Sequence, residues 1–104
     1  MLDISQTDDP KGLRIAGDVD LATVDRFRSA LAPLVREGGD IVVDMSDMRF
    51  IDSSGVQVII RALEGLGDRG RLVLSHPRRT VVRMTRVMGL QRFKNLEVQE
   101  DDPV

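Results

Sequence analysis

Apolar and polar residues alternate in two places within the first twenty positions, which is the pattern of half-buried strands. Leu2 and Ile4 carry the first alternation, and Leu13 and Ile15 carry the second. The proline and glycine of the intervening segment, 8–12, favour a turn. We therefore expect the chain to begin with a β-hairpin.

Three later stretches repeat apolar residues at the spacing of an amphipathic helix. They predict helices over about 22–36, 54–66 and 79–88. Three short apolar runs predict strands, at 41–43, 72–74 and 96–98. The first two runs contain no polar residue, which is typical of strands covered on both faces. The alternating order predicts an α/β fold, in which a hairpin followed by βαβαβ forms a mixed, mostly parallel sheet with packed helices.

The length of 104 residues is enough for one domain with one core. We expect this domain to span 1–104, with its core over about 2–98 and a frayed acidic tail over 99–104. Gly38 and Gly39 are expected to end the first helix. Gly89 is expected to end the last one in a left-handed C-cap, with the inward stripe of that helix formed by Val81, Met84, Val87 and Met88.

Composition narrows the functional classes. The chain has no cysteine, which excludes disulfides and thiolate metal sites and is compatible with a reducing cytoplasm. No apolar run approaches the length of a membrane span, and the first residues lack the features of a signal peptide. With only three aromatic residues, a stacking surface for single-stranded nucleic acid is poorly supported. We expect a cytoplasmic protein with no membrane span, no direct contact with nucleic acid, and no metal or other cofactor.

Charge is distributed unevenly along the chain, although the net charge is only −2. Residues 1–68 carry 7 basic and 13 acidic side chains, residues 69–94 carry 8 basic and none acidic, and residues 95–104 carry 4 acidic and none basic. Such segregation can orient a charged partner. Arg79, Arg83 and Arg86 share one face of the last predicted helix; a solvated face is the simpler interpretation and a docking surface for an acidic partner is the alternative.

The most specific pattern is Asp-Met-Ser-Asp-Met-Arg-Phe-Ile-Asp-Ser-Ser-Gly-Val-Gln, at 44–57. Here we expect a short acidic loop after the strand 41–43, and then a helix that begins at about Ser54. The first N–H groups of a helix have no internal partner and the helix dipole favours negative charge there, so the position suits a hydroxyl that becomes phosphorylated. The simpler interpretation is a capping box formed by Ser54 and Gln57, with Asp52 or Ser53 as other possible caps.

This pattern resembles the signature of the STAS domain, in particular that of bacterial anti-sigma factor antagonists. Gly17-Asp18-Val19-Asp20 and Met88-Gly89-Leu90 resemble two further landmarks of that family, so the resemblance covers essentially the whole chain. It implies that Ser54 is the phosphoacceptor. It also implies that Ser53 is not the acceptor, and we expect Ser53 to have a packing or capping role.

The resemblance implies a partner-switching protein that is not an enzyme. The unphosphorylated form would bind an anti-sigma factor that is also a serine kinase and so release a sigma factor; phosphorylation of Ser54 would abolish binding, and a phosphatase would reset the cycle. The expected partner-binding residues are Asp18, Asp20, Asp52, Ser53, Ser54, Gly55 and Gln57. The alternative is a STAS adaptor, never phosphorylated, in a stress-signalling or transport assembly.

Other interpretations of the polar residues are weaker. Asp18, Asp20 and Asp52 each follow a predicted strand and are expected to meet at one end of the sheet, either as helix caps in a solvated acidic rim or as part of the partner surface. In a receiver-like alternative such carboxylates hold Mg²⁺ and Asp44 accepts phosphate, but no lysine directly follows the strand 72–74. No catalytic triad is expected, because Ser54 lies outside a G-x-S-x-G elbow; the single histidine, His76, is expected at the surface. Gly55 either clears space for a partner or allows the chain to reverse.

Overall fold

The computed structural model describes residues 1–100 of the chain. A five-stranded sheet has the order β1-β2-β3-β4-β5. Its strands are β1 (Leu2–Asp8), β2 (Lys11–Val19), β3 (Ile41–Ile51), β4 (Leu72–Ser75) and β5 (Leu96–Gln99). β1 pairs antiparallel with β2, and every other pair is parallel. The helices are α1 (Val24–Glu37), α2 (Ser53–Leu66) and α3 (Arg79–Val87), with 3₁₀ turns at Gly67–Arg69 and Leu90–Arg92. The predicted hairpin and mixed α/β sheet are confirmed.

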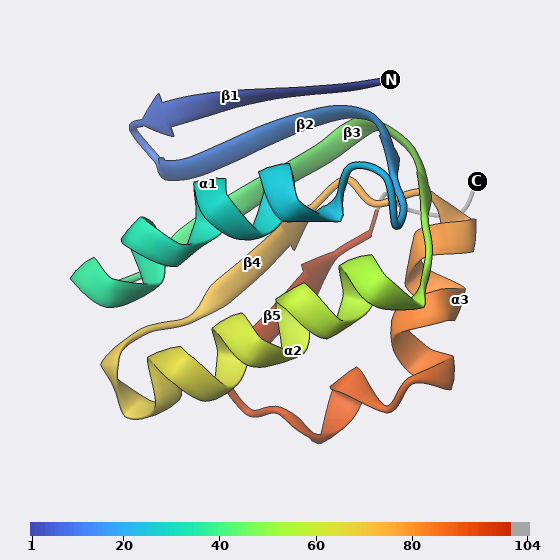
Figure 1. Cartoon of the computed structure of the whole chain (residues 1–104). Coiled ribbons are helices and arrows are strands. Elements are labelled where there is room, and N and C mark those ends of the chain that lie inside the picture. Colours follow the sequence, from blue (N-terminus) through green and yellow to red (C-terminus); the bar gives the residue numbers. More distant parts are fainter. Residues whose placement is uncertain (101–104) are drawn as a thin grey trace.

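The helices cover one face of the sheet. Each crossover leads to the next strand in the same direction, so right-handed connections carry all of them to the same side. Figure 1 shows α1 and α2 side by side across the sheet, with α3 beyond the start of α2. The prediction that strands 41–43 and 72–74 are covered on both faces is therefore wrong: Val42 and Val73, which point to the other face, are only half-buried.

The strand β3 is much longer than the predicted strand 41–43, and the expected acidic loop after it is part of the sheet. Its pairing with β2 shifts twice, between Arg14 and Ala16 and between Gly17 and Asp18. Each shift inserts an extra residue in β3, as a β-bulge does, and so breaks the alternation that marks a strand in sequence. Because of these insertions the core-facing residues after Val43 are spaced by two and then by three, at Met45, Met48 and Ile51.

The last helix and the end of the chain also differ from expectation. Val87, predicted to face inward, is 77% exposed, because the buried stripe of α3 consists of Val81, Val82 and Thr85. The left-handed Gly89 after this helix (φ 79°) is confirmed. The tail predicted over 99–104 is wrong at its start, since Gln99 belongs to β5 and Glu100 pairs with Arg86 at 2.9 Å; residues 101–104 lie outside the described residues.

Arg69 ties α1 and α2 together where both helices end. Its guanidinium donates hydrogen bonds to the carbonyl oxygens of Arg36 (3.3 Å), Val35 (3.1 Å) and Gly65 (2.8 Å). The last carbonyls of a helix lack internal partners and carry negative partial charge, so one cation here satisfies two helix ends at once. The two helices are thereby fixed relative to each other.

Candidate functional site

The acidic residues that follow β2 and β3 come together at one edge of the sheet. Val19 pairs with Ile51, and the Asp52 N–H donates to the Val19 carbonyl at 3.0 Å. The backbone N–H of Leu21 helps to lower the pKa of the Asp52 carboxyl, so the loop after β2 lies beside the start of α2. Asp20 accepts a hydrogen bond from the Ala22 N–H at 3.0 Å in the same loop.

The loop after β2 is held by Thr23. The Thr23 hydroxyl donates to the Asp18 carbonyl at 2.9 Å and accepts from the Asp20 N–H at 3.0 Å. Asp18 also pairs with Arg49 of β3 at 3.2 Å. The loop therefore presents its side chains from a backbone that is already ordered.

Asp52, and not Ser54, caps α2. Its Oδ1 accepts hydrogen bonds from the Ser54 N–H (2.9 Å), the Gly55 N–H (3.2 Å) and the Ser54 hydroxyl (2.5 Å). The capping box predicted for Ser54 and Gln57 is therefore wrong, and Gln57 is exposed. The helix begins one residue earlier than expected, at Ser53, which makes Asp52 the N-cap residue with extended backbone.

The carboxyl of Asp52 is ionised at neutral pH. Burial acts to raise its pKa, but the hydrogen bonds from Ser54, Gly55 and the Leu21 N–H outweigh it and lower the pKa below the ordinary value of 3.8. The Ser54 hydroxyl thus donates its proton to a negatively charged acceptor, and the lone pairs of its oxygen face away from Asp52.

Ser54 is half-buried, and it is not part of the buried core. Ser53 is exposed and stands at the first position of the helix. The packing or capping role predicted for Ser53 is wrong, because Asp52 caps the helix and the Ser53 side chain faces solvent. Both hydroxyls lie at the helix N-terminus, but only that of Ser54 is oriented by a carboxylate.

Gly55 is buried and serves packing. A Cβ at this position would lie 2.6 Å from Ile51 Cγ1 and 2.7 Å from Val19 Cγ1. The missing side chain lets α2 start directly on the ends of β2 and β3. The interpretation that this glycine clears space for a partner at the surface is therefore not correct.

We expect Gly55→Ala to lower the free energy of unfolding by about 1–3 kcal/mol, because the added methyl group overpacks two buried side chains. The sign of the change in the free energy of unfolding tests the packing role, because the same change at an unhindered helical site stabilises a protein by about 0.4–1 kcal/mol. Urea denaturation of this variant beside Ser53→Ala, an exposed change in the same turn, measures the effect. A gain in stability would contradict the packing role.

Two apolar side chains at this edge escaped the sequence interpretation. Leu21 is 81% exposed and Phe50 is 48% exposed. Leu21 follows Asp20 directly, and Phe50 pairs in register with Asp18. Phe50 was missed because the extra residues in β3 break the alternation that marks a strand in sequence. Leu21 could have been found, because it is the one large apolar residue in an acidic turn. We use the term Ser54 surface for Asp18, Asp20, Leu21, Phe50, Asp52, Ser53, Ser54 and Gln57.

The surroundings of Asp44 do not support the receiver-like alternative. Residues 1–100 contain no group of three or more side chains placed to hold a metal ion. Asp44 lies within β3 and accepts hydrogen bonds from the N–H and hydroxyl of Ser46, so it is not a phosphate acceptor at the end of a strand.

His76 is exposed, as expected. None of the helices in the described range has the length and apolar character needed to cross a bilayer.

Comparisons with known proteins agree with this architecture. A family model described as "Mlab, STAS domain" matches residues 2–98. The anti-sigma-B factor antagonist of Bacillus subtilis is 23% identical over 104 residues, covering 99% of this chain and 95% of that protein.

Two solved structures are similar in fold. An anti-sigma factor antagonist from Mycobacterium paratuberculosis superposes with a TM-score of 0.73 at 20% identity, over 93% of this chain and 84% of that one. The Bacillus cell fate determinant SpoIIAA in its phosphorylated form superposes with a TM-score of 0.61 at 19% identity, over 97% and 93%.

Proposed function

The chain belongs to the STAS domain family, and from this premise we propose that it is an anti-sigma factor antagonist switched by phosphorylation of Ser54. In this proposal the unmodified protein binds an anti-sigma factor with serine kinase activity in the cytoplasm and so releases a sigma factor. The kinase then phosphorylates Ser54, the complex dissociates, and a phosphatase restores the unmodified form. The protein itself catalyses no step.

One observation carries the proposal. Ser54 is half-buried at the start of α2, its hydroxyl proton is directed to the ionised Asp52, and exposed Leu21 and Phe50 lie at the same edge of the sheet. Exposed apolar side chains beside ordered polar groups are the usual make-up of a protein-binding surface. The names of the curated relative and of the structural neighbours support the same assignment.

Asp52 positions the phosphoacceptor. Because the hydroxyl proton of Ser54 is bound to Asp52 Oδ1, the oxygen presents a lone pair to an approaching phosphoryl group. In the transfer the Ser54 oxygen bonds to the γ-phosphorus of ATP, the bond from that phosphorus to the bridging oxygen breaks, and ADP leaves. Asp52 Oδ1 accepts the hydroxyl proton and then releases it to solvent.

The product is electrostatically unfavourable where it forms. The phosphate brings about −1.5 to −2 charges at neutral pH next to the Asp52 carboxylate, and the O–H donor that Asp52 had accepted is gone. The N–H groups of Ser54 and Gly55, which would otherwise favour an anion, are already bound to Asp52. The phosphate is therefore directed outward, into the space that a partner occupies, and the fold is unchanged.

We expect Asp52→Asn to be less stable than the parent at pH 7, by about 1 kcal/mol, because neutral hydrogen bonds replace charge-assisted ones. The lowered pKa of Asp52 gives the sign of the pH dependence. The stabilisation by the ionised Asp52 carboxyl is fully present above its ordinary pKa of 3.8. It is lost as the pH falls through the lower pKa that this carboxyl has in the folded state. Urea denaturation should show a smaller difference at pH 3 than at pH 7, because the contribution declines once the pH falls below 3.8; an equal difference at both would contradict the role of the charge.

The proposal is tested by isolating the partner and titrating it. A pull-down from the native cell with mass spectrometry identifies the bound anti-sigma factor, and calorimetry with the purified pair measures the affinity. We expect the unmodified protein to bind and to displace a sigma factor from the preformed complex. Binding without displacement would contradict the assignment.

A further inference from the structure

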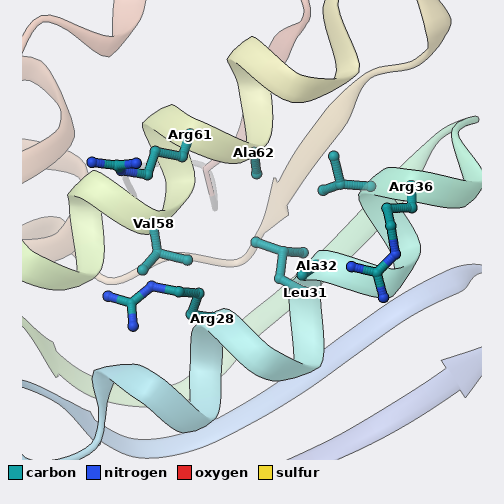
Figure 2. A pocket seen from close by; sticks show the side chains of 8 residues that line it. Arg28, Leu31, Ala32, Arg36, Val58, Arg61 and Ala62 are labelled. Atoms are coloured by element: carbon teal, nitrogen blue, oxygen red, sulfur yellow. The ribbon is translucent and has the colours of Figure 1, made fainter.

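A groove runs between α1 and α2, on the helical side of the molecule. It encloses about 230 Å³, and its lining residues are Arg28, Leu31, Ala32, Val35, Arg36, Val58, Arg61 and Ala62. Figure 2 shows Arg28 of α1 and Arg61 of α2 on either side of Val58 at one end, and Arg36 towards the other end. The floor is thus apolar and the rim is cationic.

Most of the arginines on the rim form no ion pair with the described part of the protein. Arg28 pairs with Asp25 on its own helix. Arg36 and Arg61 are exposed and make no ion pair with any residue of the described range. Both side chains are therefore available to pair with carboxylates of another molecule.

The walls of the groove are rigid before any ligand arrives. Arg69 bonds to the last carbonyls of both helices, and α1 and α2 approach so closely that a Cβ on Gly65 would lie 3.0 Å from Val35 Cγ1. A preformed site loses little conformational entropy on binding. This rigidity favours a specific occupant.

We infer that this groove binds an amphipathic helix of a partner protein, through one bulky apolar side chain flanked by two carboxylates. Arg61 lies at the same end of the groove as Arg28 (Figure 2), and Arg28 is eight residues from Arg36 on α1, so the two cationic ends are separated by about 12 Å along the helix axis. Acidic residues seven or eight positions apart on the partner helix span the same distance, with an apolar residue near the fourth position between them. A cavity of this size holds one large side chain, as central pockets of protein interfaces do.

The groove opens towards Ser54 but is a separate site. Ser54, Val58 and Ala62 follow one another at intervals of four on α2 and so share one face of the helix. A helix in the groove would end near the Ser54 surface without needing Ser54 for binding. The inference about the groove therefore does not depend on the proposal that Ser54 is phosphorylated.

A charge-swap experiment with a synthetic helix tests the inference. The probe is a fluorescent, side-chain-bridged helical peptide with glutamates at positions i and i+7 and leucine at i+4; a second peptide carries lysines in place of the glutamates. Titrations use the full chain, its Arg36→Glu, Arg61→Glu double variant, and a matched Arg79→Glu, Arg83→Glu variant on α3. The matched variant changes the net charge equally, and both of its sites are exposed.

We expect the parent and the α3 variant to bind the glutamate peptide alike and the lysine peptide at least tenfold more weakly. The Arg36→Glu, Arg61→Glu variant should show the reverse preference, and replacing the leucine by alanine should weaken binding to the parent severalfold. The inference is overturned if no saturable binding is seen, or if both double variants lose binding equally. It is also overturned if decanoate saturates the groove while neither peptide binds, because the occupant is then a small amphiphile.

Discussion

Phosphate on Ser54 is expected to weaken binding of the anti-sigma factor about hundredfold, which requires only about 3 kcal/mol. Ser54 is half-buried at the edge where Asp52 and the loop of Asp20 and Leu21 meet. A partner that contacts this edge must desolvate the added dianion, which already lies beside a carboxylate. Since the N–H groups of the helix start are occupied by Asp52, the protein itself offers the phosphate little compensation.

Variants separate this effect from a general loss of structure. Ser54→Ala should bind nearly as tightly as the parent, while Ser54→Asp should bind more weakly, in the direction of the phosphorylated protein. Ser53→Ala should bind normally and still be phosphorylated, because Ser53 is exposed and Asp52 orients only the neighbouring hydroxyl. Calorimetric titration of each variant supplies the affinities. Equal and tight binding by Ser54→Ala and the phosphorylated parent would exclude the switch.

Leu21→Asp is expected to weaken the same complex about thirtyfold, or about 2 kcal/mol. Leu21 is 81% exposed in the loop that donates to Asp52, so it is the most prominent apolar contact of the Ser54 surface. The change removes this contact and adds a negative charge beside Asp20. Stability should be unaffected, because the side chain has little contact to lose.

Val87→Asp is the matched control for Leu21→Asp. Val87 is 77% exposed on α3, and the change adds the same charge. Both variants are compared by the affinity for the partner and by the midpoint of thermal unfolding. Equal affinities for the two variants would show that the partner does not contact Leu21, and the Ser54 surface as defined would then be wrong.

The sequence predicted the order and type of the elements because their periodicity is strong. The stripes of α1 and α2 and the alternation in β1 and β2 depend on local spacing, which a single chain displays directly. The position of Ser54 at a helix start followed from the change of pattern after Ile51. Its role as phosphoacceptor came from the resemblance alone and stays a prediction.

The details that shape the site depend on contacts between distant segments. The length of β3 was missed because its bulges arise from pairing with β2, which no local pattern of 44–51 reveals. The packing role of Gly55 depends on Val19, which is 36 positions away in sequence. The choice of Asp52 as the cap over Ser54 was open from sequence, since both residue types are good caps and only the path of the strand decides between them.

Native mass spectrometry of the protein with its partner kinase and ATP tests the central claim most directly, because one spectrum reports both the phosphate count and the bound partner. During the reaction, we expect one phosphate to appear on the free protein, located at Ser54 by fragmentation, while the complex contains only unmodified chain. The Ser54→Ala variant should stay bound and unmodified throughout. A singly phosphorylated chain that remains in the complex, or a partner that binds without ever modifying Ser54, would contradict the account and favour an adaptor that is never phosphorylated.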